Sequence, residues 1–141
     1  MEHFEFLDHT ADLGIRVYGK DMTKLFQNAA RALFQCIGNT DRACVHQWID
    51  LELTGMDKED LMVNWLRELL YLFQVKELFL SRFQIRELTE NTLKARVGGE
   101  TMDVQRHDIV REIKAATYHG IRVEKVPLPH EHWEAEIIFD V

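Results

Sequence analysis

The chain has 141 residues, of which 46% are hydrophobic and 29% charged, and its formal net charge at pH 7 is −7. This is the composition of one ordinary globular domain over residues 1–141, and it excludes collagen-like, proline-rich and disordered chains. The acidic balance argues against strong direct binding to nucleic acid and favours a partner protein with a basic surface. Because no apolar run approaches the ~18 residues of a transmembrane helix and the first residues lack the features of a secretory signal, we expect a cytoplasmic protein without membrane contact.

The first quarter of the chain predicts two strands and a helix. Residues 2–7 and 13–18 alternate polar and apolar side chains, as half-buried strands do, and a short polar connection joins them. Apolar residues at helical spacing predict a helix over 22–37. Asp21 is suited to cap the start of this helix, and Gly38 to take the left-handed conformation after its end.

The middle of the chain predicts a strand, a second helix and two further strands. Residues 44–53 alternate as a strand. The stretch 58–75, with Asp57 as its N-cap, has a broad apolar face and predicts a helix that is nearly engulfed by its neighbours. Residues 79–88 and 92–97 predict strands, and a shift in the alternation near the end of the first one indicates a bulge.

The last third is less regular until its end. Residues 98–108 are polar, so we expect an irregular segment in which Gly98-Gly99-Glu100 forms a turn. The stretch 109–118 fits either a helix or a strand, and its β-forming residues favour the strand. Residues 133–141 predict a closing strand. The predicted class is therefore α+β, with a single domain whose two main helices are packed on a mostly antiparallel or mixed β-sheet.

Several carboxylates stand next to the predicted strands. Asp8 and Asp12 bracket the first connection, and Asp140 is followed by the terminal carboxylate of Val141. If the last strand ends near that connection, these groups converge, and their mutual repulsion requires a cation. Oxygen ligands would select Ca²⁺, Mg²⁺ or Mn²⁺. By spacing alone the simpler interpretation is favoured, in which Asp8 and Asp12 cap turns and Asp140 lies in solvent at a chain end.

Other polar residues have equally simple explanations. Lys114, among small and apolar neighbours, could balance the carboxylates or could extend along an exposed strand face, and the second is favoured. Glu68 is expected on a solvated stripe of the second helix. His9, His107 and His119 lack the spacing of metal-binding motifs, so structural roles are expected for them.

The sequence contains no enzyme signature such as a phosphate-binding loop or a nucleophile elbow. The two cysteines, Cys36 and Cys44, lack metal-site spacing, and we expect reduced, buried thiols rather than a disulfide or a zinc site.

Four strings, taken together and in this order, resemble the archease family over essentially the whole chain. They are DHTAD at 8–12, LMVNWLRELLYL at 61–72, IKAATYH at 113–119 and FDV at 139–141. The resemblance implies a metal-binding accessory protein of an RtcB-type RNA ligase. That ligase takes GMP from GTP onto a histidine with Mn²⁺ and joins RNA ends that carry a 2′,3′-cyclic phosphate or a 3′-phosphate to 5′-hydroxyl ends, in tRNA splicing and RNA repair. Archeases promote its guanylylation and multiple turnover.

The resemblance also implies which residues carry the activity. The family's metal-binding positions fall on Asp12, Asp140 and the carboxylate of Val141, and its activity-linked lysine falls on Lys114. The expected cofactor is a divalent metal ion, Ca²⁺, Mg²⁺ or Mn²⁺. Residues expected around the ion are Asp8, His9, Glu68 and His119. The alternative function, supported by the carboxylates and the lysine, is a stand-alone metal-dependent phosphohydrolase or nuclease.

Overall fold

The computed structural model describes residues 3–7 and 12–141. Its elements, in chain order, are β1 (Phe4–Leu7), β2 (Leu13–Gly19), α1 (Met22–Ile37), the 3₁₀ helix η1 (Thr40–Arg42), β3 (Gln47–Thr54), α2 (Lys58–Gln74), β4 (Leu78–Leu88), β5 (Thr92–Thr101), β6 (Ala115–Ala116), β7 (Arg122–Val126) and β8 (His132–Asp140). Every strand pairing among these residues is antiparallel. The predicted α+β class is confirmed.

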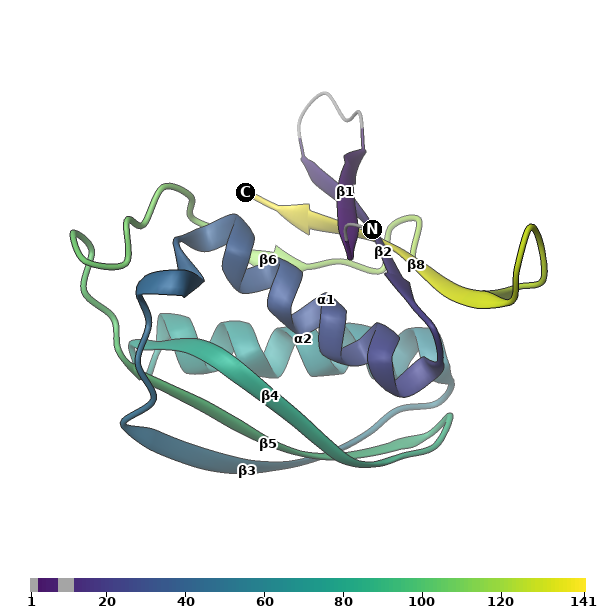
Figure 1. Ribbon diagram of the computed structural model, residues 1–141, viewed down its shortest axis with the longest axis horizontal. Coiled ribbons are helices and arrows are strands. Elements are labelled where there is room, and N and C mark those ends of the chain that lie inside the picture. The colour runs from purple at the N-terminus through teal and green to yellow at the C-terminus, as the bar shows by residue number, and fades with distance from the viewer. Residues whose placement is uncertain (1–2, 8–11) are drawn as a thin grey trace.

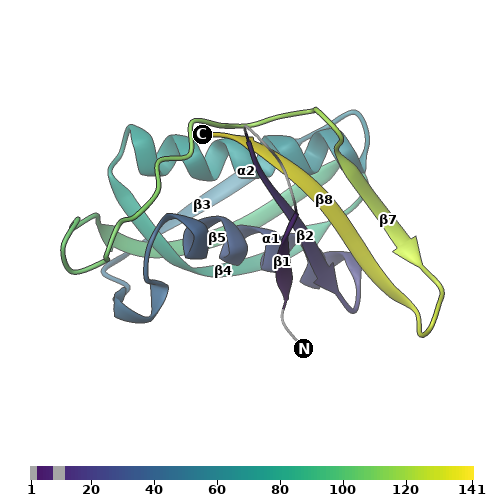
Figure 2. The same ribbon diagram turned by 90° about the horizontal axis from the view of Figure 1, so that it is seen from above.

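The strands divide into two sheets, which the sequence did not indicate. One has the order β1-β2-β8-β6, with β7 also paired to β8, and the other has the order β3-β5-β4. The helices lie between the sheets, so that each sheet covers one side of the helical layer (Figure 1). Seen from above, β8 and β2 run across the helices (Figure 2). The last strand of the chain is thereby the central strand of its sheet.

The two helices begin where their capping residues predict. The Asp21 side chain accepts a hydrogen bond from the backbone amide of Lys24 at 2.7 Å, and Asp57 accepts one from Asp60 at 2.8 Å. Gly38 is not in the left-handed region, because its φ of −163° is extended. Its small size is what matters, since a Cβ there would lie 2.7 Å from the carbonyl oxygen of His107.

Aromatic side chains fill the space between the layers. The largest fully buried ones are Trp65, Phe26, Phe34, Phe79 and Phe139. Burying each ring stabilises the fold by roughly 1.5–3 kcal/mol. The indole of Trp65 also donates a hydrogen bond of 2.9 Å to the carbonyl oxygen of Phe26, so α2 is fixed to α1 in the centre of the core.

The prediction of an irregular segment over 98–108 is wrong at its start. Gly98 and Gly99 lie within β5 rather than in a turn. A Cβ on Gly98 would meet the ring of Trp48 at 2.9 Å, and one on Gly99 would meet the carbonyl oxygen of Phe79 at 2.2 Å. The glycines therefore allow other groups to pack closely against the strand, which is a common reason for glycine inside a strand.

Two further strands differ from the sequence pattern. Within 109–118 only β6 is a strand, so the preference for strand over helix holds for two residues. The strand β7 was not predicted, and it pairs with β8 from Arg122↔Glu136 to Val126↔His132. The bulge predicted near the end of β4 is confirmed by a register shift between Ile85 and Glu87.

Candidate functional site

The first strand pair and the tail of the chain meet at one end of the larger sheet. Leu13 of β2 is paired with Phe139 of β8. Asp12 precedes Leu13 and Asp140 follows Phe139, so the two aspartates occupy the next positions outward on neighbouring strands. The C-terminus correspondingly lies beside the start of β2 (Figures 1 and 2). Residues 128 positions apart in the chain are thus brought to one place, as the carboxylate hypothesis requires.

A third segment joins this end from the opposite side of β8. Ala115 of β6 is paired with Asp140, and the backbone amide of Lys114 donates a hydrogen bond of 2.7 Å to the carbonyl oxygen of Asp140. We call this region the acidic end: Asp12, Asp140 and the terminal carboxylate of Val141, with Lys114 beside them. Its members come from three chain segments, and β8 in the middle fixes their relative positions.

The acidic end is open to solvent. Asp140 and Lys114 are exposed, Asp12 is half-buried and Val141 is 42% exposed. Within the part of the chain that the structure describes, the Asp140 carboxylate forms no hydrogen bond or ion pair. The donor set consists of carboxylate oxygens, which suits a hard divalent cation such as Ca²⁺, Mg²⁺ or Mn²⁺. The residues present therefore fit the metal that was expected there.

The structure describes two of the four residues expected around the ion. Asp8 and His9 lie outside the described residues. Glu68 is half-buried on α2, where it lines a hollow with Glu52 and Tyr71, and no contact of the described residues joins it to the acidic end. His119 is exposed in the segment after β6. The structure thus brings together Asp12, Lys114 and Asp140 but not Glu68.

Side chains of α2 hold the segment that carries Lys114. Four hydrogen bonds connect them to it. Arg67 Nε donates to the carbonyl oxygen of Ala116 (3.0 Å), Gln74 Nε2 donates to those of Ile113 (2.7 Å) and Lys114 (3.1 Å), and the Tyr118 hydroxyl donates to Asp60 (2.5 Å). The guanidinium of Arg67 also lies over the Tyr118 ring, 4.8 Å from its centroid. Although β6 has only two residues, the path of this segment is therefore fixed by α2 as well as by β8.

Sequence reasoning missed a second polar site, which we call the Glu100 cluster: the carboxylate of Glu100 on β5 with Arg106, His107 and the backbone amide of Cys44. Glu100 is 4% exposed. Its carboxylate accepts two hydrogen bonds from Arg106 at 2.6 and 2.7 Å, one from the backbone amide of Cys44 at 2.7 Å, and bonds the ring of His107 at 2.8 Å. The hydrogen bonds from Arg106, opposed by burial, hold the pKa of the Glu100 carboxyl far below its ordinary value.

The Glu100 cluster has a structural role. Glu100, Cys44 and His46 have potential metal-ligand atoms within 4.8 Å of one another, but both Glu100 oxygens already accept hydrogen bonds from other groups. The expectation of a buried thiol is wrong for Cys44, which is exposed, and confirmed for Cys36, where burial raises the pKa to about 11. The structural role expected for His107 is confirmed, since its buried ring stacks on Phe79.

Among the described residues, no helix has both the length and the apolar character needed to cross a bilayer.

Comparison with known proteins places these features in a family. Residues 4–141 match the model of the Archease protein family. A protein archease from Methanosarcina mazei is 37% identical, with 98% of this chain and 95% of the relative covered. One from Pyrococcus abyssi is 37% identical over the full length of both chains.

Solved structures agree with this assignment. The solution structure of protein 1598 from Methanobacterium thermoautotrophicum has a TM-score of 0.80 and 29% identity, and all of both chains is covered. A crystal structure from Thermotoga maritima, described as an archease and possible chaperone, has a TM-score of 0.64 and 20% identity, with 96% of this chain and 94% of the other covered. The second likeness shows the shared fold.

Proposed function

The chain belongs to the archease family, and on that premise we propose that it is an accessory protein which binds a divalent metal ion at the acidic end and promotes the guanylylation and multiple turnover of an RtcB-type RNA ligase. The observation that carries the proposal is the pairing of Leu13 with Phe139, which sets Asp12 and Asp140 side by side at an exposed edge.

The acidic end has the properties that an activating surface needs. Asp12, Asp140 and the carboxylate of Val141 would hold the ion, which when bound supplies positive charge for the phosphate oxygens of a nucleotide. Lys114 would add a second positive charge that needs no metal. Because the sheet and α2 fix the backbone here, the groups are already arranged before a partner arrives, and less conformational entropy is lost on docking.

The net charge agrees with a ligase as the partner. A ligase that holds RNA carries a basic groove, and a chain with a net charge of −7 complements it. Electrostatic attraction of this kind mainly accelerates association, so we expect the activation to weaken as salt concentration rises.

Guanylylation of the ligase tests the proposal directly. The protein is mixed with its cognate ligase, GTP and Mn²⁺, and covalent GMP on the ligase is followed with time. We expect Asp12→Asn and Asp140→Asn each to lower the rate enhancement at least tenfold, since each removes a carboxylate charge from the acidic end.

The matched control is Asp50→Asn, which removes an 89% exposed carboxylate of β3 and should leave the enhancement unchanged. Equal ligase rates with and without the wild-type protein would refute an activator role. An unchanged enhancement in both acidic-end variants would instead leave the family assignment intact and exclude the acidic end as its basis.

The alternative of a stand-alone phosphohydrolase or nuclease is not favoured, because the curated relatives are archeases. Incubating the purified protein with nucleotide or RNA and a divalent metal, without ligase, separates the two functions. Turnover that Asp12→Asn abolishes would support the enzyme.

A further inference from the structure

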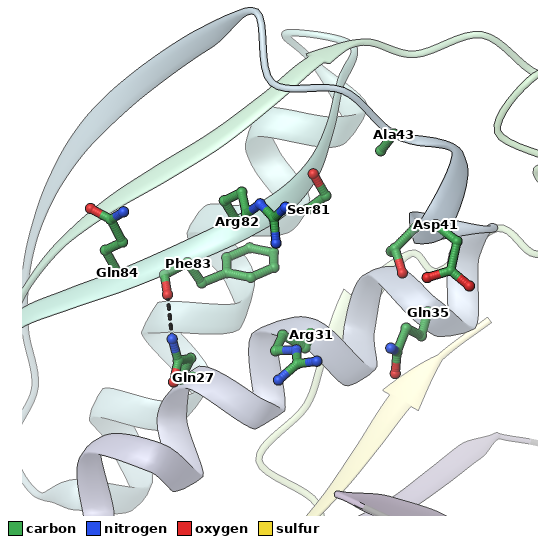
Figure 3. Close-up of a pocket in the computed structure, with 10 residues that line it drawn as sticks. Gln27, Arg31, Gln35, Asp41, Ala43, Ser81, Arg82, Phe83 and Gln84 are labelled. Carbon is green, nitrogen blue, oxygen red and sulfur yellow. Dashed lines mark hydrogen bonds between the residues drawn. The ribbon is translucent and has the colours of Figure 1, made fainter.

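A polar groove lies between α1 and β4, away from the acidic end. It has a volume of about 540 Å³, and η1 closes one end of it. Its walls carry Gln27, Arg31 and Gln35 from α1 and Ser81, Arg82 and Gln84 from β4 (Figure 3). None of these residues belongs to β2, β6 or β8, the strands at whose ends the acidic end lies. The groove is therefore a second, separate surface.

The walls of the groove follow from the periodicity of both elements. Gln27, Arg31 and Gln35 are spaced by four residues, so they form one stripe along α1. Arg82 and Gln84 are two residues apart on β4, so they point to the same face of the sheet. Phe83 between them points to the opposite face, into the core, so Arg82 and Gln84 lie along the outer rim of the groove, across from the stripe of α1.

The arginines of the groove differ from most others in this acidic chain. Arg16 and Arg122 both bond the carboxylate of Glu136, and Arg106 bonds Glu100. Within the described residues, Arg31 and Arg82 form no hydrogen bond or ion pair. Two exposed guanidinium groups line one groove while the nearest acidic wall residue, Asp41, lies at its end on η1 (Figure 3).

We propose that this groove binds the phosphate groups of a single RNA strand. Guanidinium groups bind phosphate through two parallel hydrogen bonds, and the amides of Gln35 and Gln84 and the hydroxyl of Ser81 are further donors. Gln27 connects the two walls of the groove, because its side-chain amide donates a hydrogen bond of 2.7 Å to the carbonyl oxygen of Phe83 (Figure 3). The volume accommodates more than one phosphate.

The lining favours RNA over an acidic peptide. Peptide-binding grooves gain most of their affinity from apolar or aromatic pockets at their centre. Here the aromatic wall residue, Phe83, is 4% exposed and belongs to the core. Contacts through phosphates need no such pocket and are independent of base sequence.

The choice of RNA rests on the proposed function, in which the ligase partner holds an RNA end. The net charge of −7 opposes RNA at a distance, so affinity for free RNA is modest and the groove serves a strand that the ligase already holds. This agrees with the expectation that the chain does not bind nucleic acid strongly by itself.

Binding of a fluorescent, 3′-phosphorylated hexaribonucleotide by the protein alone, at low ionic strength, tests the proposal. We expect Arg31→Gln with Arg82→Gln to weaken binding at least tenfold. The slope of log K against log salt should become less steep by about 1.4, because two phosphate contacts on a single strand are lost. Arg31→Lys with Arg82→Lys retains both charges and should recover most of the affinity.

The control is Arg86→Gln, since Arg86 is another exposed arginine of β4 that lies outside the groove lining. It should change binding by less than twofold. An equal loss in this variant, an unchanged affinity in the double variant, or equally tight binding of a polyglutamate peptide would each overturn the proposal. The assay contains neither ligase nor GTP, so its result is independent of the guanylylation test.

Discussion

The Glu100 cluster and the acidic end are both built on carboxylates, but the protein satisfies them in opposite ways. Glu100 is buried, and its oxygens bond Arg106, His107 and a backbone amide. Asp140 is exposed, and its carboxylate has no bond to any described residue. A buried carboxylate whose two oxygens both accept hydrogen bonds stabilises the fold, whereas one whose oxygens face solvent remains available to a cation. The contrast predicts that Glu100 contributes to stability and that the acidic end contributes to the proposed metal binding, and each prediction can be tested.

The largest expected effect is on stability at Glu100. Glu100→Gln keeps the shape of the side chain but removes the charge that pairs with Arg106, and we expect the free energy of unfolding to fall by about 3 kcal/mol. Urea denaturation at pH 7 measures this difference. The matched variant Asp140→Asn should change the free energy of unfolding by less than about 0.5 kcal/mol. Similar losses in the two variants would remove the distinction between the clusters.

The pH dependence of the free energy of unfolding should show the contribution of the ionised Glu100 carboxylate. The pKa of Glu100 is lowered in the folded protein from the ordinary value of 4.5, so the unfolded state takes up a proton first as the pH falls. The stabilisation is therefore present above pH 4.5 and is lost below it, by at most about 1.4 kcal/mol per pH unit. Glu136 and Asp103 also have lowered pKa values, so the wild-type curve contains several contributions.

The difference between wild type and Glu100→Gln, measured by urea denaturation at intervals from pH 6 to pH 3, isolates the contribution of Glu100. The gap between the two curves should narrow as the pH falls below 4.5. A constant gap over this range would show that the lost stability does not come from the Glu100 charge.

A smaller effect is expected from metal binding at the acidic end. Mn²⁺ at ten times its dissociation constant should raise the free energy of unfolding by about 1.4 kcal/mol, because the ion binds only the folded state. Asp140→Asn should remove this increase, and Glu100→Gln should keep it. Thermal unfolding with and without Mn²⁺ provides the measurement, and an equal shift in Asp140→Asn would place the ion elsewhere.

The smallest effect concerns the support of Lys114. Tyr118→Phe removes the exposed hydrogen bond to Asp60 and should lower the free energy of unfolding by roughly 0.5 kcal/mol. Hydrogen exchange at the amide of Lys114, which bonds Asp140, should accelerate more than exchange within β5. Equal acceleration in both places would indicate that α2 does not hold this segment separately.

Local pattern was sufficient for the helices and for most strands. The capping bonds of Asp21 and Asp57 and the bulge in β4 lie where the sequence predicted them, because caps and periodicity depend on residues within one or two turns. The same local reasoning failed at Gly98 and Gly99, where the need for glycine comes from Trp48 and Phe79, which are far away in the chain.

The α+β class and the helices were predictable from the sequence, since they depend on residue type and local spacing. The candidate residues Asp12, Lys114 and Asp140 came from the resemblance to the archease family, because spacing alone favoured simpler roles for them. Only the three-dimensional structure shows that the strands form two sheets around the helices, that β8 is central, and that the Glu100 carboxylate is bonded while that of Asp140 bonds no described residue. These features depend on which distant segments pair, and strand pairing is set by the burial of whole faces, which no single segment encodes.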